Sequence, residues 1–248
     1  MKYGPIWGIC TCSQTPDKLI ECIREFKSEG AHGAVLNLEK LDRKFWSIEF
    51  FRQIFTAVPD IGIYACFYRD EQTKNLTDDD RAKYLLMAAE AGADIVDVMG
   101  DLFDSQPNEL TMNSNAIDKQ KKIIAEIKKF GAEVLMSSHV NKPMNTEETL
   151  KYFYAHSERG VDISKAVFVT TTETELQESR NTSEKLYTDL PIPFVYVCSG
   201  KYGVNFQRFE TLLNGSIMTF VRCYENDVQP TVKQVLKFLQ RHTPWANF

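Results

Sequence analysis

The sequence lacks any apolar run that approaches the length of a transmembrane helix. Such a helix needs about 20 mostly apolar residues, whereas the hydrophobic residues here, 43% of the chain, are interrupted throughout by charged ones. The chain also lacks the charged and then apolar opening of a secretory signal. We therefore expect a cytoplasmic protein that has no membrane as a partner.

Three kinds of ligand site also lack their usual sequence signals. No G-x-G-x-x-G follows the first apolar run, so a dinucleotide site is not supported. Cys10 and Cys12 have no second cysteine pair and no histidines at zinc-site spacing, which predicts buried, reduced thiols and no metal. The net charge is −5 without a basic stripe, which argues against nucleic acid as a partner.

Strand-like and helix-like segments alternate along the whole sequence. The expected strands are 6–12, 33–38, 61–67, 93–98, 133–139, 165–169, 193–199 and 217–222. The expected helices are 16–29, 45–58, 77–91, 116–130, 146–159, 172–186, 206–213 and 231–241. Eight such units in 248 residues, with short connections and no linker, predict one (β/α)8 TIM barrel over residues 1–248. An open, doubly wound sheet is the alternative, although it usually has fewer strands and a phosphate-binding glycine loop.

Candidate catalytic residues concentrate in residues 133–169. A strand ending at His139, a helix and a strand carrying Lys165 form one βαβ unit, whose two strands we expect to be parallel and adjacent. A lysine inside an apolar run is costly to bury as a cation, and its neutral amine is the form that attacks a carbonyl. A histidine on the next strand could then move protons at the bound carbon. The alternative is a lysine that merely ends a strand or pairs with an acid.

This stretch resembles the type I 3-dehydroquinate dehydratases. The resemblance rests on Ser138-His139 after an apolar strand and on Gly160-Val-Asp-Ile-Ser-Lys165 one helix later. It extends to Asp94-Ile-Val-Asp97 and to Gly200-Lys201-Tyr202-Gly203, followed by Gly215-Ser216. It covers nearly the whole chain at the level of strand order.

The resemblance implies a lyase of the shikimate route to aromatic amino acids. It implies that Lys165 forms a Schiff base with a small keto acid, that His139 is the general acid/base, and that 3-dehydroquinate loses water to give 3-dehydroshikimate. No metal or organic cofactor is implied, and a homodimer is possible. The residues that would bind the substrate are Arg208, Gln229, Arg69 and Ser216.

The sequence departs from the family pattern at several pocket positions. Met99 stands where the family has the glutamate that positions the histidine, so we expect slow turnover unless another acid makes that contact. Asp97 and Glu39 are the candidates for that acid. The Glu-x-Arg pair of the second strand is lost, and the arginine of the third strand falls at Tyr68, or at Arg69 if the alignment slips by one.

These departures leave two other functions open. One is a class I aldolase-like enzyme that acts on another keto acid, because the same imine supports carbon–carbon cleavage. The other is a non-catalytic binding protein on the same scaffold, since fold and function are separable.

The remaining ionisable and aromatic groups predict structural roles. We expect His32, His156 and His242 to be surface or capping residues. The run Asp78–Asp80 is typical of a helix start, and the aromatic residues of 45–55 have the spacing of a helix face that packs on the barrel exterior.

Overall fold

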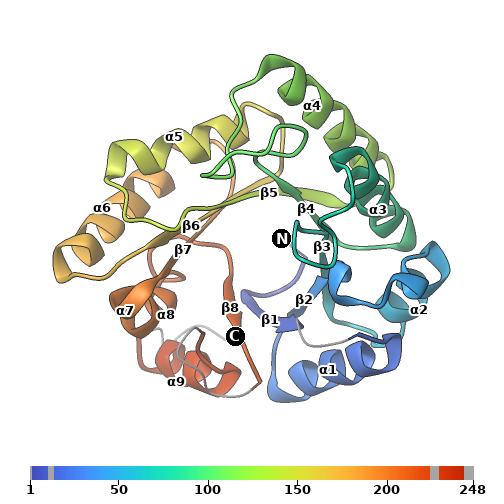
Figure 1. Cartoon of the computed structure of the whole chain (residues 1–248). Coiled ribbons are helices and arrows are strands. Elements are labelled where there is room, and N and C mark those ends of the chain that lie inside the picture. Colours follow the sequence, from blue (N-terminus) through green and yellow to red (C-terminus); the bar gives the residue numbers. More distant parts are fainter. Residues whose placement is uncertain (1, 11–13, 224–228, 243–248) are drawn as a thin grey trace.

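Eight parallel strands surround a central axis, and the helices that connect them lie outside (Figure 1). The computed structural model describes residues 2–10, 14–223 and 229–242; Cys12 therefore lies outside the described residues. The strands are β1 (Ile6–Cys10), β2 (Gly33–Asn37), β3 (Gly62–Cys66), β4 (Ile95–Met99), β5 (Glu133–His139), β6 (Ile163–Val169), β7 (Phe194–Ser199) and β8 (Thr219–Val221). The predicted (β/α)8 barrel is confirmed.

The strand order follows the sequence around the barrel. Each strand from β2 to β7 pairs with the strand before it, and β8 pairs with β1. Just before β8, the Ile217 amide donates to the Phe194 carbonyl of β7 at 3.0 Å, so the barrel is nearly closed. Because all strands are parallel, their carboxyl ends meet at one end, the C-terminal mouth, where barrels of this kind place their reacting groups.

The helices begin and end at the sequence signals that normally cap helices. They are α1 (Pro16–Glu29), α2 (Ile48–Thr56), α3 (Asp78–Ala91), α4 (Ser114–Lys129), α5 (Thr146–Ser157), α6 (Glu173–Asp189), α7 (Gly200–Tyr202), α8 (Arg208–Glu210) and α9 (Val232–His242). In α3 the Thr77 and Asp80 side chains each bond the other's backbone, which confirms the acidic run as a helix start. The left-handed φ of Gly92, 102°, ends this helix.

The two helices that differ most from the sequence expectation are α2 and α8. A 3₁₀ turn at Arg43–Phe45 precedes α2, so the helix begins at Ile48 rather than at residue 45. The segment expected as a helix over 206–213 instead runs from α7 through a π turn at Gly203–Gln207 into α8. A π turn holds more residues than an α turn, so the segment does not continue the α-helical pattern expected for it.

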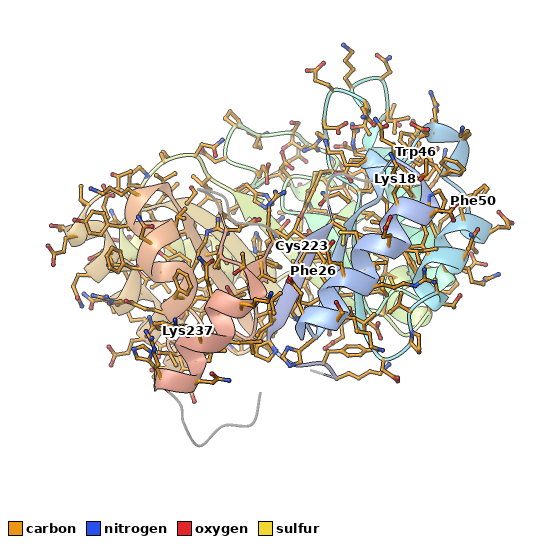
Figure 2. All side chains as sticks on the ribbon, turned by 90° about the horizontal axis from the view of Figure 1, so that it is seen from below. Lys18, Phe26, Trp46, Phe50, Cys223 and Lys237 are labelled. Carbon is orange, nitrogen blue, oxygen red and sulfur yellow. The ribbon has the colours of Figure 1, made fainter. Side chains whose placement is uncertain are left out.

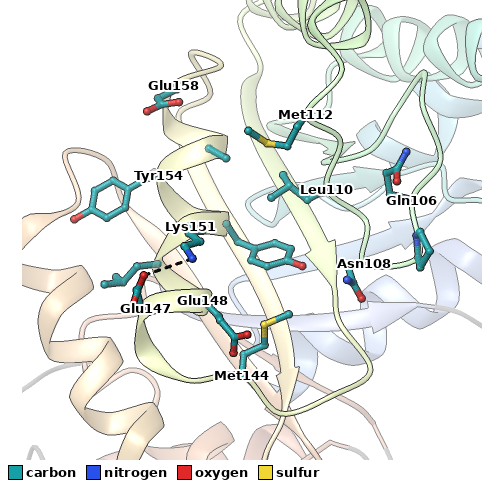
Figure 3. Close-up of a pocket in the computed structure, with 14 residues that line it drawn as sticks. Gln106, Asn108, Leu110, Met112, Met144, Glu147, Glu148, Lys151, Tyr154 and Glu158 are labelled. Atoms are coloured by element: carbon teal, nitrogen blue, oxygen red, sulfur yellow. Dashed lines mark ion pairs between the residues drawn. The ribbon is translucent and has the colours of Figure 1, made fainter.

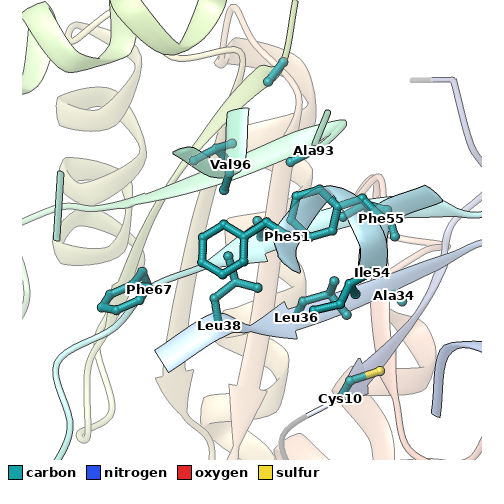
Figure 4. Close-up of a cluster of buried hydrophobic side chains, with 14 of the residues drawn as sticks. Cys10, Ala34, Leu36, Leu38, Phe51, Ile54, Phe55, Phe67, Ala93 and Val96 are labelled. Atoms are coloured by element: carbon teal, nitrogen blue, oxygen red, sulfur yellow. The ribbon is translucent and has the colours of Figure 1, made fainter. Parts of the chain in front are cut away.

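The hydrophobic core forms two layers separated by the barrel wall. The inner layer fills the barrel, and it contains Ile95, Leu135 and Val195, with Val167 and Ile217 packed against them. The outer layer lies between strands and helices, where Phe51, Ile54 and Phe55 of α2 cover Leu36 and its neighbours (Figure 4). The aromatic face of 45–55 therefore packs on the barrel exterior as predicted.

The helix α1 packs against β1 without space between them. An added Cβ at Gly8 would lie 2.2 Å from the Phe26 ring, so the strand needs glycine at this point. Figure 2 shows α1 and α9 next to each other, with Phe26 labelled between them. In the described part of the chain, no helix is both long and apolar enough to cross a membrane.

Candidate active site

Lys165 lies inside the barrel with its amine directed to the C-terminal mouth. Its side chain is only 7% exposed. Strand register pairs Lys165 with Ser137 and Val167 with His139. The Lys165 backbone therefore lies two residues farther from the mouth than that of His139, and the long lysine side chain extends back toward the histidine. The amine nitrogen Nζ lies 3.4 Å from His139 Nε2, 3.4 Å from the Tyr64 hydroxyl and 3.3 Å from the Tyr68 hydroxyl. The structure thus brings Lys165 and His139 together within reach of one small ligand.

The acid nearest to Lys165 is Asp97, which is fully buried. Its Oδ2 lies 3.6 Å from the Lys165 amine and accepts hydrogen bonds of 2.5 Å from both tyrosine hydroxyls, Tyr64 and Tyr68. Its Oδ1 accepts a bond of 2.6 Å from Ser137. Burial and the Asp97 charge raise the pKa of both tyrosines well above the usual value, so both remain neutral hydroxyl donors. The buried lysine is therefore paired, and Asp97 balances its charge.

His139 is held by an acid that the sequence did not indicate. Glu109 Oε2 lies 2.8 Å from His139 Nδ1 and also accepts the His139 backbone amide at 2.8 Å. Asp97 bonds the hydroxyl groups described above and does not contact His139. Glu39 accepts bonds from Asn37 and from the Tyr68 amide. The expectation that Asp97 or Glu39 makes this contact is wrong.

Glu109 comes from the long connection between β4 and α4. This connection runs over residues 100–113 without a helix or strand, and loops longer than about 12–15 residues are uncommon and usually either functional or disordered. The length of this connection is the one sequence feature that suggests a functional role for it. An irregular loop has no periodicity, so no sequence pattern distinguishes among its acids Asp101, Asp104 and Glu109.

Arg69 lies at the mouth beside Met99 but is engaged by two acids. Its guanidinium pairs with Asp78 at 2.5 Å and with Asp101 at 2.6 Å, and it lies 3.9 Å from the Met99 sulfur. Burial alone would lower the pKa of Arg69, but the hydrogen bonds from these two carboxylates outweigh it and the pKa is raised. The ion pairs of Arg69 therefore connect the loops that follow β3 and β4.

Arg208 is a buried cation with no acidic partner in the described residues. It is 5% exposed, and its Nε donates to the Cys198 carbonyl near the end of β7 at 2.8 Å. Burial lowers the pKa of Arg208 to about 10. A buried, unpaired guanidinium is costly, and it presents a planar pair of donors that suits a carboxylate.

The other two residues expected to bind substrate have different surroundings. Gln229 Oε1 accepts a bond of 2.6 Å from Arg222, just after β8. Ser216 precedes β8 and accepts the Tyr196 amide at 2.8 Å, level with the early part of β7. Gln229 thus follows β8, on the mouth side, whereas Ser216 precedes β8 and bonds the backbone of β7.

The histidines outside this site show one departure from expectation. His242 bonds the Phe238 carbonyl near the end of α9, as expected for a capping residue, and His32 accepts the Ile6 amide. His156, by contrast, is fully buried between Ser138 and Ser164, each at 3.0 Å. Burial lowers its pKa to about 3, so the expectation of a surface or capping role is wrong for His156. It is a neutral bridge from α5 to β5 and β6.

A groove of about 830 Å³ lies on the outer side of the loop that carries Glu109. Residues 106–112 form one wall and α5 forms the other, with Glu147 paired to Lys151 on its rim (Figure 3). Neither Lys165 nor His139 lines it. Among the described residues, no group of three or more His, Cys, Asp or Glu side chains is arranged to hold a metal.

The sequence matches the profile of a protein family described as Type I 3-dehydroquinase over residues 9–242. The chain belongs to this family. Since the match covers most of the barrel, it includes both Lys165 and His139. Type I 3-dehydroquinases are hydro-lyases that act on a small molecule.

Solved structures of this family share the fold at low sequence identity. The 3-dehydroquinate dehydratase of Geobacillus kaustophilus HTA426 is 14% identical, with a TM-score of 0.82 over 98% of this chain and 93% of that one. The type I enzyme of Clostridium difficile, with covalently modified comenic acid, is 16% identical, with a TM-score of 0.81 over 97% and 92%. The Enterococcus faecalis enzyme is 17% identical, with a TM-score of 0.76 over 96% and 94%. No curated protein sequence matches the chain.

Proposed function

We propose that this protein dehydrates 3-dehydroquinate to 3-dehydroshikimate through a Schiff base on Lys165, in the shikimate route to aromatic amino acids. The observation that carries the proposal is the 3.4 Å separation of Lys165 Nζ and His139 Nε2 inside the barrel mouth. Membership of the type I 3-dehydroquinase family supports the substrate.

The arrangement around Lys165 suits imine chemistry. The amine attacks the substrate ketone, and the resulting carbinolamine loses water to give an iminium ion. The Lys165 ammonium gives up one proton before it attacks, and the carbinolamine hydroxyl gains one proton as it leaves as water, so the iminium carries the same charge as the ammonium did. The Tyr68 hydroxyl, which donates to Asp97, accepts a hydrogen bond from the amine at 3.3 Å and orients it. Once the iminium has replaced the lysine ammonium, Asp97 lies beside it and balances its positive charge, as it did for the ammonium.

His139 performs the proton transfers at the adjacent carbon. An ionised Glu109 only accepts hydrogen bonds, so the proton of the neutral His139 ring lies on Nδ1 and the lone pair of Nε2 faces the lysine. Nε2 takes the proton that the iminium has acidified. The protonated ring then gives that proton to the leaving hydroxyl, water departs, and hydrolysis of the imine restores Lys165.

Arg208 is our candidate for binding the substrate carboxylate. It is buried, and no acid pairs with it in the described part of the chain. A carboxylate would supply the missing countercharge through two parallel hydrogen bonds. We assign no substrate contact to Arg69 or Ser216, because acids and a backbone amide occupy their polar groups.

The test of this proposal is borohydride reduction in the presence of 3-dehydroquinate. We expect the intact mass to rise by one reduced substrate adduct, and peptide mapping to place it on Lys165. The exposed Lys201 serves as an internal control, because a non-specific reaction would modify it too. Absence of both adduct and turnover would contradict the proposal and favour a binding protein. An adduct only with a different keto acid would favour an aldolase-like enzyme.

Met99→Glu, which restores the acid of the family pattern, is expected to give no gain in turnover. Glu109 already occupies His139 Nδ1, and a carboxylate at position 99 would meet Arg69, whose Nη1 lies 3.9 Å from the sulfur. Steady-state kinetics of the variant and the parent provide the measurement. A gain of tenfold or more would mean that Glu109 leaves His139 incompletely oriented.

A further inference from the structure

The loop over residues 100–113 is built to bring Glu109 to His139. Glu109 has a φ of 48°, in the left-handed region that residues with a side chain seldom adopt. The Ser138 hydroxyl donates to the Glu109 carbonyl at 2.6 Å. This bond comes from the residue next to His139, so the loop is joined to the strand that carries the histidine.

Buried side chains from the neighbouring helices hold both ends of this loop. Arg159, which follows α5, donates to the Gly100 carbonyl at 2.6 Å and to the Thr111 carbonyl at 2.5 Å. Gln120 of α4 donates to the carbonyls of Gly100 and Leu102. A long connection that is braced in this way can keep a residue in a strained conformation.

Glycine at position 100 allows the loop to approach the strand. An added Cβ there would lie 2.5 Å from the Ser138 hydroxyl oxygen and 2.6 Å from the Glu109 carbonyl oxygen. No side chain can therefore occupy position 100 while Ser138 and Glu109 remain bonded.

We propose that Glu109 is the positioning residue for His139, and that the 100–113 loop thereby supplies the carboxylate that strand β4 lacks at Met99. This rests on the proposed function for its catalytic consequence. One carboxylate oxygen accepts both the ring Nδ1–H and the backbone amide of His139. These two bonds set the ring orientation and its tautomer, so that Nε2 presents a lone pair beside Lys165.

The electrostatic surroundings agree with an ionised Glu109. Its side chain is 32% exposed, and burial by itself would raise its pKa. Hydrogen bonds from His139 outweigh burial, and the pKa of Glu109 is lowered. The carboxylate therefore also stabilises the imidazolium that forms when His139 takes the substrate proton.

The test compares Glu109→Gln and Glu109→Gly with the charge-matched control Glu147→Gln. Glu147 is 86% exposed on α5 and contacts Lys151. Glu109→Gly keeps the carbonyl that Ser138 bonds and suits the positive φ, so its fold is not at risk. We expect both Glu109 variants to lower kcat by about 10- to 100-fold, which is part of the contribution of general acid/base catalysis. We expect KM to change by less than about threefold, and the control to match the parent.

A spectroscopic measurement separates this proposal from the proposed function. Imidazole ¹⁵N shifts of the resting protein should show His139 protonated on Nδ1 in the parent and in Glu147→Gln. Both Glu109 variants should show a mixture of tautomers. If the Nδ1–H tautomer persists in both variants, Glu109 does not position the ring, whatever the kinetics. If the tautomer shifts but the parent forms no borohydride adduct, the positioning role holds and the proposed reaction fails.

Discussion

Lys165→Met is expected to lower turnover of 3-dehydroquinate by on the order of 10⁴- to 10⁶-fold and to abolish the borohydride adduct. The reason is that methionine keeps most of the stem but removes the only described amine within 3.4 Å of both His139 and the tyrosine hydroxyls. Steady-state kinetics and intact mass provide the measurement. Turnover that remains within tenfold of the parent would exclude an imine on Lys165.

The same substitution should also destabilise the fold through Asp97. Removing one partner of a buried ion pair costs about 3–5 kcal/mol, but three hydroxyl groups still bond Asp97, so we expect a loss of about 1–3 kcal/mol. Asp97→Asn in the Lys165→Met background removes the unpaired charge and should recover at least half of that loss in urea denaturation, without recovering activity. A double variant that is no more stable than Lys165→Met would show that Asp97 does not compensate Lys165.

His139→Asn is expected to lower kcat by about 10²- to 10⁴-fold, the usual contribution of a general acid/base. Asparagine keeps a polar side chain of similar reach but cannot exchange a proton near neutral pH. The Lys165 adduct should still form, because the attacking amine and its Asp97–Tyr68 surroundings are unchanged. Kinetics and borohydride trapping on the same samples separate the two steps.

The control for that variant is His242→Asn, at the exposed end of α9, which should match the parent. Loss of the adduct in His139→Asn would contradict the assignment, since it would mean that the histidine acts in imine formation rather than at the adjacent carbon.

The fold could be predicted from the sequence because each strand and helix of the barrel has its own local sequence pattern. Alternating apolar runs and capped helices recur eight times, and helical crossovers force the strands to be parallel. Local signals also gave the boundaries of most helices, as at Thr77 and Gly92. They failed over 206–213, because a π turn depends on how the segment packs against β7 rather than on the residues within it.

The pairing of Lys165 with His139 could also be inferred from the sequence. Both residues lie on strands of one βαβ unit, and such strands are neighbours in the sheet. A register that places Lys165 opposite Ser137 sets the lysine deeper than the histidine, and its long stem brings the two nitrogens together.

Only the tertiary structure decided which partners these two residues have. The sequence makes Asp97 a candidate partner for His139, but in the structure Asp97 contacts Lys165 and two tyrosines, one on β3 and one in the connection that follows it. Glu109 reaches His139 from an irregular loop, and His156 is buried because α5 lies over β5 and β6. The physical reason is the same in each case. Periodicity determines which face of an element a residue occupies, whereas the contacts of a loop or a barrel interior depend on elements far apart in the sequence.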